Sequence, residues 1–306
     1  MLNDQGAFDL NLFRFFLQAD GLYSGFVQPR WSVVVHPNGG YLMSMIISAM
    51  RGEITQRDPL TLTGHFLSPT VHDQPCEIRV EVVKQSKRME VVTATMVQEH
   101  VGEDGQTEIR ERMRVIGSFG KLKVAGDEHK EQWHVNTQMP SIPPPEECME
   151  DAHGPPLLRK MVPLVGRTEV RMDPASSWAT RMCQGENGPG GSPSYTCWVR
   201  FSDGRPPCLR AMAYFNDGLP PPVLNSVEGM PWVPTMELTL HFLQRPDKDK
   251  CKDHWVLLDY KCDVLLGGRM VAETTLWDTE GNLLSQSRQM GMLVPDPRVG
   301  ATKGTE

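Results

Sequence analysis

The stretch PWVPTMELTLHFLQRP, from Pro231 to Pro246, alternates apolar and polar residues in the way that predicts a β-strand with one buried face. Its ending, HFLQRP, has a near copy far upstream, HFLSP at His65–Pro69. Only the second copy begins with Pro-Thr, at Pro234 and Thr235. The apolar residues that would share the buried face of the second copy are Met236, Leu238, Leu240 and Phe242. The chain therefore carries one strand pattern twice, with a difference at its start.

The first half of the chain predicts one helix followed by four strands. Within residues 38–52, the segment from Tyr41 to Met50 has no charged residue, which predicts a helix buried on all sides. Residues 60–122 then alternate as an antiparallel meander, for example in EIRVEVV at 77–83. A central helix wrapped by a curved sheet would account for both patterns.

The second half repeats this order. Residues 207–219 predict a helix, with Pro207 near its start, and four strand patterns follow from Thr235 onward. Aligning the two HFL endings also pairs Thr63 with Thr239. A repeat in the order of elements indicates two copies of one helix-in-sheet unit.

The composition changes between the two copies. SIPPPEE, HGPP and GENGPGGSPS are rich in Pro and Gly and are typical of linkers and surface loops. We therefore divide the chain into an N-terminal unit over residues 1–123, a linker or insertion over 124–162, and a C-terminal unit over 163–306.

Composition and charge exclude several classes of protein. The 306 residues are 39% hydrophobic and 23% charged, which is ordinary for a globular protein. The net charge of −7, without any run of four Lys or Arg, argues against a nucleic-acid partner. Since no apolar stretch approaches the roughly 18–20 residues that cross a bilayer, we expect no membrane span.

The cysteines and the chain ends suggest a reducing compartment. Seven cysteines are scattered without a C-x-x-C pair, so we expect free thiols rather than disulfides or a zinc site. The N-terminal segment has acids where a signal peptide needs basic residues. We expect a cytoplasmic protein without metal or cofactor. A peroxisomal location stays open, although the ending GTE is not an S-K-L signal.

Six segments of the chain resemble the double-hotdog acyl-CoA thioesterases, in particular the acyl-CoA thioesterase II family and its thioesterase-like relatives. They are NGGYLM at 38–43, HFLSP at 65–69, TEVRMDP at 168–174, AYFNDGLPP at 213–221, PTMELTLHF at 234–242 and GGRMVAETTLWDTEGNLLSQSRQ at 267–289. The resemblance covers both halves but not the middle insertion. It implies an α+β double hotdog: two repeats, each a long central helix wrapped by a curved antiparallel sheet, joined into one continuous sheet.

The same resemblance implies a catalytic trio from the second repeat: Asp217 late in the second helix, Thr235 opening the next strand, and Gln289 on the last strand. The family often has Ser-Asp where this chain has Asn216 before the acid, which leaves the acid in place. A His that the family usually has near the position of Thr63 is absent, although His65 lies two residues further on.

Each member of the trio also has a plain structural interpretation. An Asp before a Gly and two prolines is typical of a turn, a Thr after a Pro can simply start a strand, and an outward Gln is common in an alternating strand. The resemblance favours the functional interpretation of all three.

Thioester hydrolysis needs a positioned water, a base and donors for the developing oxyanion. Asp217 can serve as the base because partial desolvation raises the pKa of a carboxyl group. The hydroxyl of Thr235 and the carboxamide of Gln289 can hold the water or donate to the substrate. The sequence contains no G-x-S-x-G elbow, so no covalent nucleophile is required.

A predicted substrate-binding group opens the first helix. Gly39 and Gly40 would let a ligand approach backbone amides, and the amides of Gly40 and Tyr41 are candidate oxyanion donors. Asn38 would orient substrate or act as an N-cap. Met43 is a candidate for the wall of an acyl channel, because Met adapts to irregular apolar surfaces. Close backbone packing explains a Gly-Gly pair equally well.

Three functions remain open at this point: hydrolysis of an acyl thioester carried by CoA or a carrier protein, hydration or dehydration by a hotdog enzyme, and non-catalytic acyl-thioester binding. No His lies within the second predicted helix, which disfavours the hydratases. The exposed edges of such sheets favour a homo-oligomer.

Overall fold

The computed structural model describes residues 16–126, 137–150, 162–183, 191–229, 231–249 and 251–294. The signals considered at the two ends of the chain and most of the predicted linker therefore lie outside the described residues.

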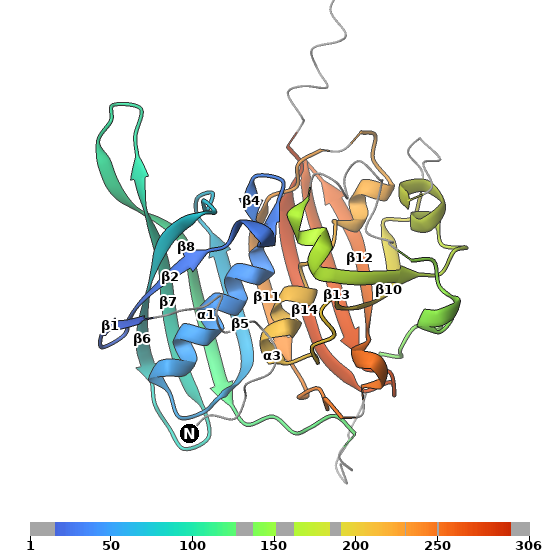
Figure 1. The fold of residues 1–306 in the computed structure, drawn as a ribbon, viewed down its shortest axis with the longest axis horizontal. Coiled ribbons are helices and arrows are strands. Elements are labelled where there is room, and N and C mark those ends of the chain that lie inside the picture. Colours follow the sequence, from blue (N-terminus) through green and yellow to red (C-terminus); the bar gives the residue numbers. More distant parts are fainter. Residues whose placement is uncertain are drawn as a thin grey trace, which may run out of the picture.

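One antiparallel sheet of twelve strands dominates the described part of the chain, and Figure 1 shows it curving behind the helices. The strands of the first half are β1 (Phe16–Ala19), β2 (Leu22–Val27), β5 (Asp58–Phe66), β6 (Gln74–Lys84), β7 (Glu90–Val101) and β8 (Thr107–Gly120). Those of the second half are β9 (Thr168–Met172), β10 (Ser194–Phe201), β11 (Thr235–Phe242), β12 (Val256–Leu266), β13 (Arg269–Trp277) and β14 (Leu283–Met292). Their order is β1-β2-β6-β7-β8-β5-β11-β14-β13-β12-β10-β9, so the expectation of one continuous sheet is confirmed.

Helices and a small ribbon complete the described fold. The α-helices are α1 (Gly39–Glu53) and α3 (Leu209–Phe215), and β3 (Ser32–Val33) pairs with β4 (His36–Pro37). The short helices are η1 (Pro29–Trp31), η2 (Pro145–Glu147), η3 (Pro163–Arg167), η4 (Ala179–Cys183), η5 (Pro222–Asn225) and η6 (Lys252–His254).

The sheet continues across the junction of the two halves in a symmetric register. Strands β5 and β11 pair antiparallel, with Thr63 opposite Thr239 and their hydroxyl oxygens 3.0 Å apart. These two residues are also the equivalents in the repeat alignment. On one side of this pair His65 faces Glu237, and on the other side Thr61 faces His241, the equivalent of His65. A twofold relation between the repeats thus passes through the Thr63–Thr239 pair.

Within the described residues, only the first repeat has a long central helix. Helix α1 has 15 residues and is buried from Gly40 to Ile47, as its uncharged sequence predicted. Helix α3 has only 7 residues, so the expectation of a long helix in each repeat is wrong for the second. Prolines precede α3. After it, Gly218 and the prolines that follow Leu219 prevent the helix from continuing. Both helices lie on one face of the sheet (Figure 1), where the Ser44 hydroxyl donates to the carbonyl of Arg210 across their contact.

A bulge changes the face assignment at the start of β11. Leu238, Leu240 and Phe242 are buried as the alternation predicts, but Met236 is 40% exposed. The pairing of β11 with β14 shifts register between Thr235 and Glu237. A bulge lets two residues on one strand oppose one on its neighbour, so the side chains before it switch faces. The expectation for Met236 was therefore wrong.

The described part of the predicted linker packs against the second repeat. Met149 exchanges backbone hydrogen bonds with Met172 of β9, and the indole of Trp198 donates to the carbonyl of Pro143 at 2.9 Å. These contacts attach the segment to the outer edge of the second repeat, whereas the domain boundaries themselves stay a prediction. All seven cysteines are free thiols. No helix in the described ranges is long and apolar enough to cross a membrane.

Candidate active site

The carboxylate of Asp217 lies where the end of α3 meets the start of α1. The chain turns here after α3, and the backbone N–H of Gly40 donates to Asp217 Oδ2 at 2.8 Å. Unpaired amides at a helix N-terminus favour a negative charge. The side chain of Asn38 donates to the same oxygen at 3.2 Å and to the backbone carbonyl of Asp217 at 2.6 Å. Residues from both repeats therefore hold this one carboxylate.

Gln289 connects the carboxylate to the sheet. It is 3% exposed on the inner face of β14, and its Nε2 donates to Asp217 Oδ1 at 2.8 Å and to the hydroxyl oxygen of Thr235 at 2.5 Å. The hydroxyl of Tyr260, on β12, donates to Gln289 Oε1 at 2.6 Å. Since the amide oxygen accepts from Tyr260, the amide nitrogen must face Asp217 and Thr235. The structure thus brings the three predicted catalytic residues into one hydrogen-bonded cluster.

The bulge in β11 turns Thr235 toward this cluster. Strict alternation would place Thr235 on the outer face with Glu237 and Thr239, but the register shift pairs Thr235 with Gly291, on the inner-facing set of β14. The Thr235 hydroxyl accepts a hydrogen bond from Gln289, and among the described residues no acceptor is seen for its own proton. That proton is available to a substrate oxygen.

The environment of Asp217 raises its pKa from 3.8 to about 6, and burial is the cause. Hydrogen bonds from the backbone amides of Gly39 and Gly40 and from the side chains of Gln289 and Asn38 act in the opposite direction and limit the increase. A carboxyl group with a pKa near 6 is ionised at neutral pH and is a stronger base than an ordinary aspartate. Within the ranges that the structure describes, no three His, Cys, Asp or Glu side chains lie close enough together to hold a metal ion.

Asn38 forms the N-cap contact that the sequence predicted. Its Oδ1 accepts from the backbone N–H of Tyr41 at 2.9 Å. Its Nδ2 is directed at Asp217. One side chain therefore starts α1 and holds the candidate base, while a contact between Asn38 and substrate stays a prediction.

Gly39 and Gly40 allow Asp217 and the backbone of α3 to approach the start of α1 closely, and the amides at this helix start are not open to a ligand. A Cβ on Gly39 would lie 2.8 Å from Asp217 Oδ2, and one on Gly40 would lie 2.5 Å from the carbonyl oxygen of Ala213. The amide of Gly40 is bonded to Asp217 and that of Tyr41 to Asn38. The expectation that these two amides stabilise the oxyanion does not agree with this geometry, because both already have acceptors inside the protein.

Tyr41 and Met43 lie in the core beneath the site. Both have no exposed surface. The Tyr41 hydroxyl accepts from the backbone N–H of Gln28 at 3.1 Å, and its ring stacks on Trp31 at 5.5 Å between centroids. The sulfur of Met43 would lie 2.8 Å from a Cβ on Gly64 of β5. These contacts hold both side chains in the core, and their role toward substrate stays a prediction.

Tyr260 is the site residue that the sequence analysis missed. The alternation of β12 places it on the inner face, where it is 2% exposed. A buried tyrosine usually needs a partner for its hydroxyl, and this need is the only sequence signal that could have drawn attention to it. His65 and His241, in contrast, are exposed on the other face of the sheet, as expected for strand-surface histidines.

Within the described residues, the first repeat has no equivalent cluster. Gly117 in β8 stands at the position that Gln289 has in β14, because the two residues pair with equivalent positions of β5 and β11. Pro59 stands at the position of Thr235. A side chain on Gly117 would begin 3.0 Å from the ring of Phe119, so apolar residues fill this place. The polar cluster exists once in the described chain.

The substitution Gly40→Ala tests the close approach of the two helices. Because the added Cβ would overlap the carbonyl oxygen of Ala213, we expect a loss of roughly 1–3 kcal/mol in the free energy of unfolding, despite the higher helix propensity of Ala. The matched control is Gly102→Ala, whose Cβ would come close only to the movable carboxylate of Asp104. Urea denaturation of both variants measures the difference. Equal stability of Gly40→Ala and wild type would contradict this account.

Comparisons with known proteins agree with this fold. The sequence profile of an acyl-CoA thioesterase N-terminal domain matches residues 27–120, and that of an acyl-CoA thioesterase C-terminal domain matches residues 143–293. None of the curated protein sequences matches the chain.

Solved structures share the fold at low sequence identity. A proposed thioesterase II of Thermobifida fusca is 24% identical and superimposes with a TM-score of 0.75, over 92% of this chain and 97% of the other. A hotdog-fold protein of unknown function from Alicyclobacillus acidocaldarius is 21% identical, with a TM-score of 0.72 over 91% and 96%. A proposed thioesterase of Novosphingobium aromaticivorans is 20% identical, with a TM-score of 0.71 over 94% and 100%.

Proposed function

The chain belongs to the acyl-CoA thioesterase family, and we propose that it hydrolyses an acyl-CoA, or another acyl thioester, to the carboxylic acid and the thiol. The observation that carries the proposal is the cluster of Asp217, Gln289 and Thr235, in which a basic carboxylate and an available hydroxyl proton lie next to each other. This pair supplies the base and the donor that thioester hydrolysis needs.

In the proposed reaction, Asp217 takes a proton from a water molecule as that water attacks the thioester carbonyl carbon. The Thr235 hydroxyl donates to the carbonyl oxygen as it becomes negative. Collapse of the tetrahedral intermediate breaks the C–S bond, and the proton held by Asp217 goes to the departing thiolate. One thioester and one water thus give one carboxylic acid and one thiol. Gln289 and Asn38 hold the carboxylate throughout, because both donate to it.

The alternative chemistry of a hydratase or dehydratase has less support. The groups bonded to the Asp217 carboxylate are backbone and side-chain amides, with no imidazole among the described residues. His65 and His241, from the central strands, are exposed on the opposite face of the sheet. A purely binding role does not require a carboxylate with a raised pKa, which favours catalysis over simple binding.

One assay separates the three functions. The protein is incubated with short, medium and long acyl-CoAs and with an enoyl-CoA, and free thiol and double-bond absorbance are followed. We expect thiol release. Loss of the double bond without thiol release would favour a hydratase, and saturable binding without either signal would favour an accessory protein.

The pH dependence of kcat/KM follows from Asp217. Since the base must be ionised, we expect kcat/KM to rise with pH, to reach half of its maximum at about 6, and to stay level above that. Initial rates between about pH 4.5 and 8.5 measure the profile. A rate that falls as pH rises through this window would mean that the essential form of Asp217 is the protonated one.

A further inference from the structure

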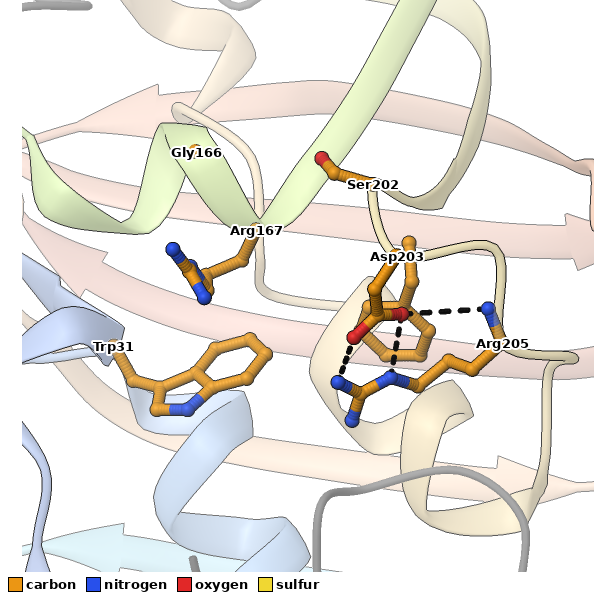
Figure 2. Close-up of a pocket in the computed structure, with 7 residues that line it drawn as sticks. Trp31, Gly166, Arg167, Ser202, Asp203 and Arg205 are labelled. Carbon is orange, nitrogen blue, oxygen red and sulfur yellow. Dashed lines mark hydrogen bonds and ion pairs between the residues drawn. The ribbon is translucent and has the colours of Figure 1, made fainter.

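A second polar site lies outside the candidate active site, where β10 ends. Figure 2 shows a pocket lined on one side by the indole of Trp31, with Arg167, Ser202, Asp203 and Arg205 around it. Its volume is about 150 Å³. The guanidinium of Arg167 lies next to the indole, while Asp203 and Arg205 pair with each other on the opposite side.

The pocket has one positive charge in excess. Arg205 and Asp203 form an ion pair, so their charges compensate. For Arg167, the described residues offer no carboxylate partner, and its buried Nε has no hydrogen-bond partner there. A guanidinium in this state favours a bidentate oxyanion such as a phosphate, with the exposed hydroxyl of Ser202 as a second donor. This local excess stands on a chain whose net charge is −7.

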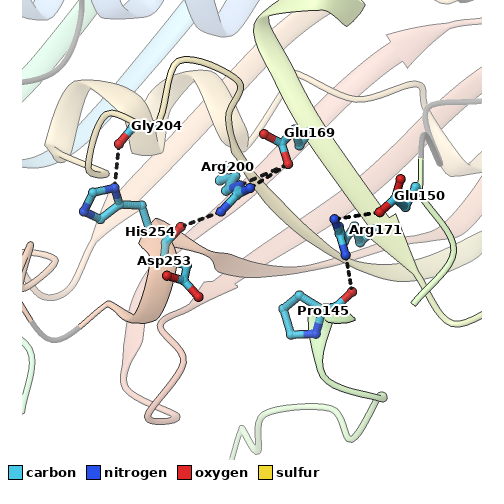
Figure 3. A network of polar contacts seen from close by, with 8 residues as sticks. All are labelled: Pro145, Glu150, Glu169, Arg171, Arg200, Gly204, Asp253 and His254. Atoms are coloured by element: carbon cyan, nitrogen blue, oxygen red, sulfur yellow. Dashed lines mark hydrogen bonds and ion pairs between the residues drawn. The ribbon is translucent and has the colours of Figure 1, made fainter. Parts of the chain in front are cut away.

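The walls of the pocket are held in place. The backbone N–H of Ser202 donates to the carbonyl of Arg167 at 3.0 Å, which fixes the two walls to each other. The carbonyl of Gly204 accepts from His254 Nδ1 at 2.7 Å. Figure 3 shows that Arg200, on β10 itself, pairs with Glu169 of the neighbouring strand β9. A pocket with fixed walls loses less conformational entropy when it binds a ligand.

The pocket and the active site share the segment that precedes α1. The backbone carbonyl of Trp31 accepts from the N–H of Asn38 at 2.9 Å, and Asn38 donates to Asp217. The indole of Trp31 also packs edge-on against Tyr214 at 5.1 Å, in the helical turn before Asp217. The pocket and the carboxylate of Asp217 are thus connected through the short segment from Trp31 to Asn38.

We propose that this pocket binds a phosphate group of the thiol carrier, with CoA as the carrier, so that Arg167 holds the nucleotide end while the thioester lies at Asp217. The inference rests on the proposed thioesterase function. It adds a specificity determinant that lies outside the catalytic cluster. A carrier without the nucleotide phosphates would lose the contact with Arg167 and keep the contacts at Asp217.

The test compares two substrates and several variants of the full chain. We expect Arg167→Ala to raise KM for an acyl-CoA on the order of ten- to a hundredfold, the range of a charge-assisted hydrogen bond, with little change in kcat. The same acyl group on N-acetylcysteamine, which has no phosphate, should show unchanged kcat/KM. Arg167→Gln should behave like Arg167→Ala, and Arg79→Ala, at an exposed ion pair on β6, should leave both substrates unaffected.

Direct binding separates this inference from the proposed function. Calorimetry with adenosine 3′,5′-bisphosphate, and with inorganic phosphate, should show binding to the wild type that weakens with salt and is lost in Arg167→Ala. If no thioester is hydrolysed, the proposed function fails, but loss of bisphosphate binding in the variant still supports the pocket. Equal effects on both substrates, or unchanged bisphosphate binding in Arg167→Ala, would overturn the assignment.

Discussion

Asp217→Asn should reduce kcat/KM for thioester hydrolysis by roughly 10²–10⁴, the usual contribution of a general base. Asparagine has the size of aspartate but cannot accept the proton of the attacking water. The residual rate should lose its dependence on pH near 6, because that dependence comes from the Asp217 carboxyl group. Rates with one acyl-CoA at several pH values measure both effects.

The control for Asp217→Asn is Asp263→Asn on β12, an exposed carboxylate on a strand of the same sheet. It should retain wild-type activity. Activity of Asp217→Asn within a few-fold of this control would remove Asp217 from the mechanism.

Stability gives a second measurement on the same variant. The pKa of Asp217 is raised on folding, so its contribution to stability is complete below about 3.8 and is lost as pH rises through about 6. An asparagine at this position does not titrate, and the melting temperature of Asp217→Asn should therefore increase relative to wild type between about pH 4 and pH 8. A constant difference across that range would mean that burial does not raise this pKa.

Much of the fold could be predicted from the sequence because the two repeats have local patterns. The alternation of β11 and the uncharged helix α1 each require burial on a definite side, and apart from Met236 each is buried as expected. The bulge at Thr235 could not be predicted, because it depends on how β11 pairs with β14. The length of the second helix was overestimated for a related reason. Its predicted last turn leaves the helix after Phe215 and places Asp217 against α1, a contact with the other repeat.

The candidate site, like the fold, could be predicted from the sequence only in part. Its three principal residues came from the resemblance to a family, and the structure brings them together. Their hydrogen-bond partners could not be derived from spacing, because Asn38 and Tyr260 are distant in the chain from Asp217. The expectation for Gly40 lacks the same information: a sequence shows an amide at a helix start, but not the carboxylate from the other repeat that accepts from it, and a role of Gly40 toward substrate stays a prediction.

Gln289→Ala is the second substitution from which we expect a large loss, about 10²–10³ in kcat, comparable to the removal of a donor that stabilises charge in an active site. Gln289 holds Asp217 Oδ1 and the hydroxyl of Thr235 at once, so its removal frees both groups. Its hydrogen bond also lowers the pKa of Asp217. The rise of the residual activity with pH should therefore lie at a higher pH than in wild type, and a loss of structure alone would not cause this shift.

Two further variants test whether the loss of kcat comes from the oriented amide of Gln289. Gln286→Ala changes a residue of the same strand that lies on the opposite face, and it should have wild-type kinetics. Tyr260→Phe removes only the hydroxyl that fixes the amide of Gln289, so part of the amide population can turn its oxygen toward Asp217. That orientation replaces a donor by an acceptor beside a carboxylate, and we expect a smaller loss in kcat with the same direction of shift in the pH profile. If Tyr260→Phe lowers stability but leaves kcat and its pH profile unchanged, the tyrosine does not orient the amide, and Gln289 is held by its strand alone.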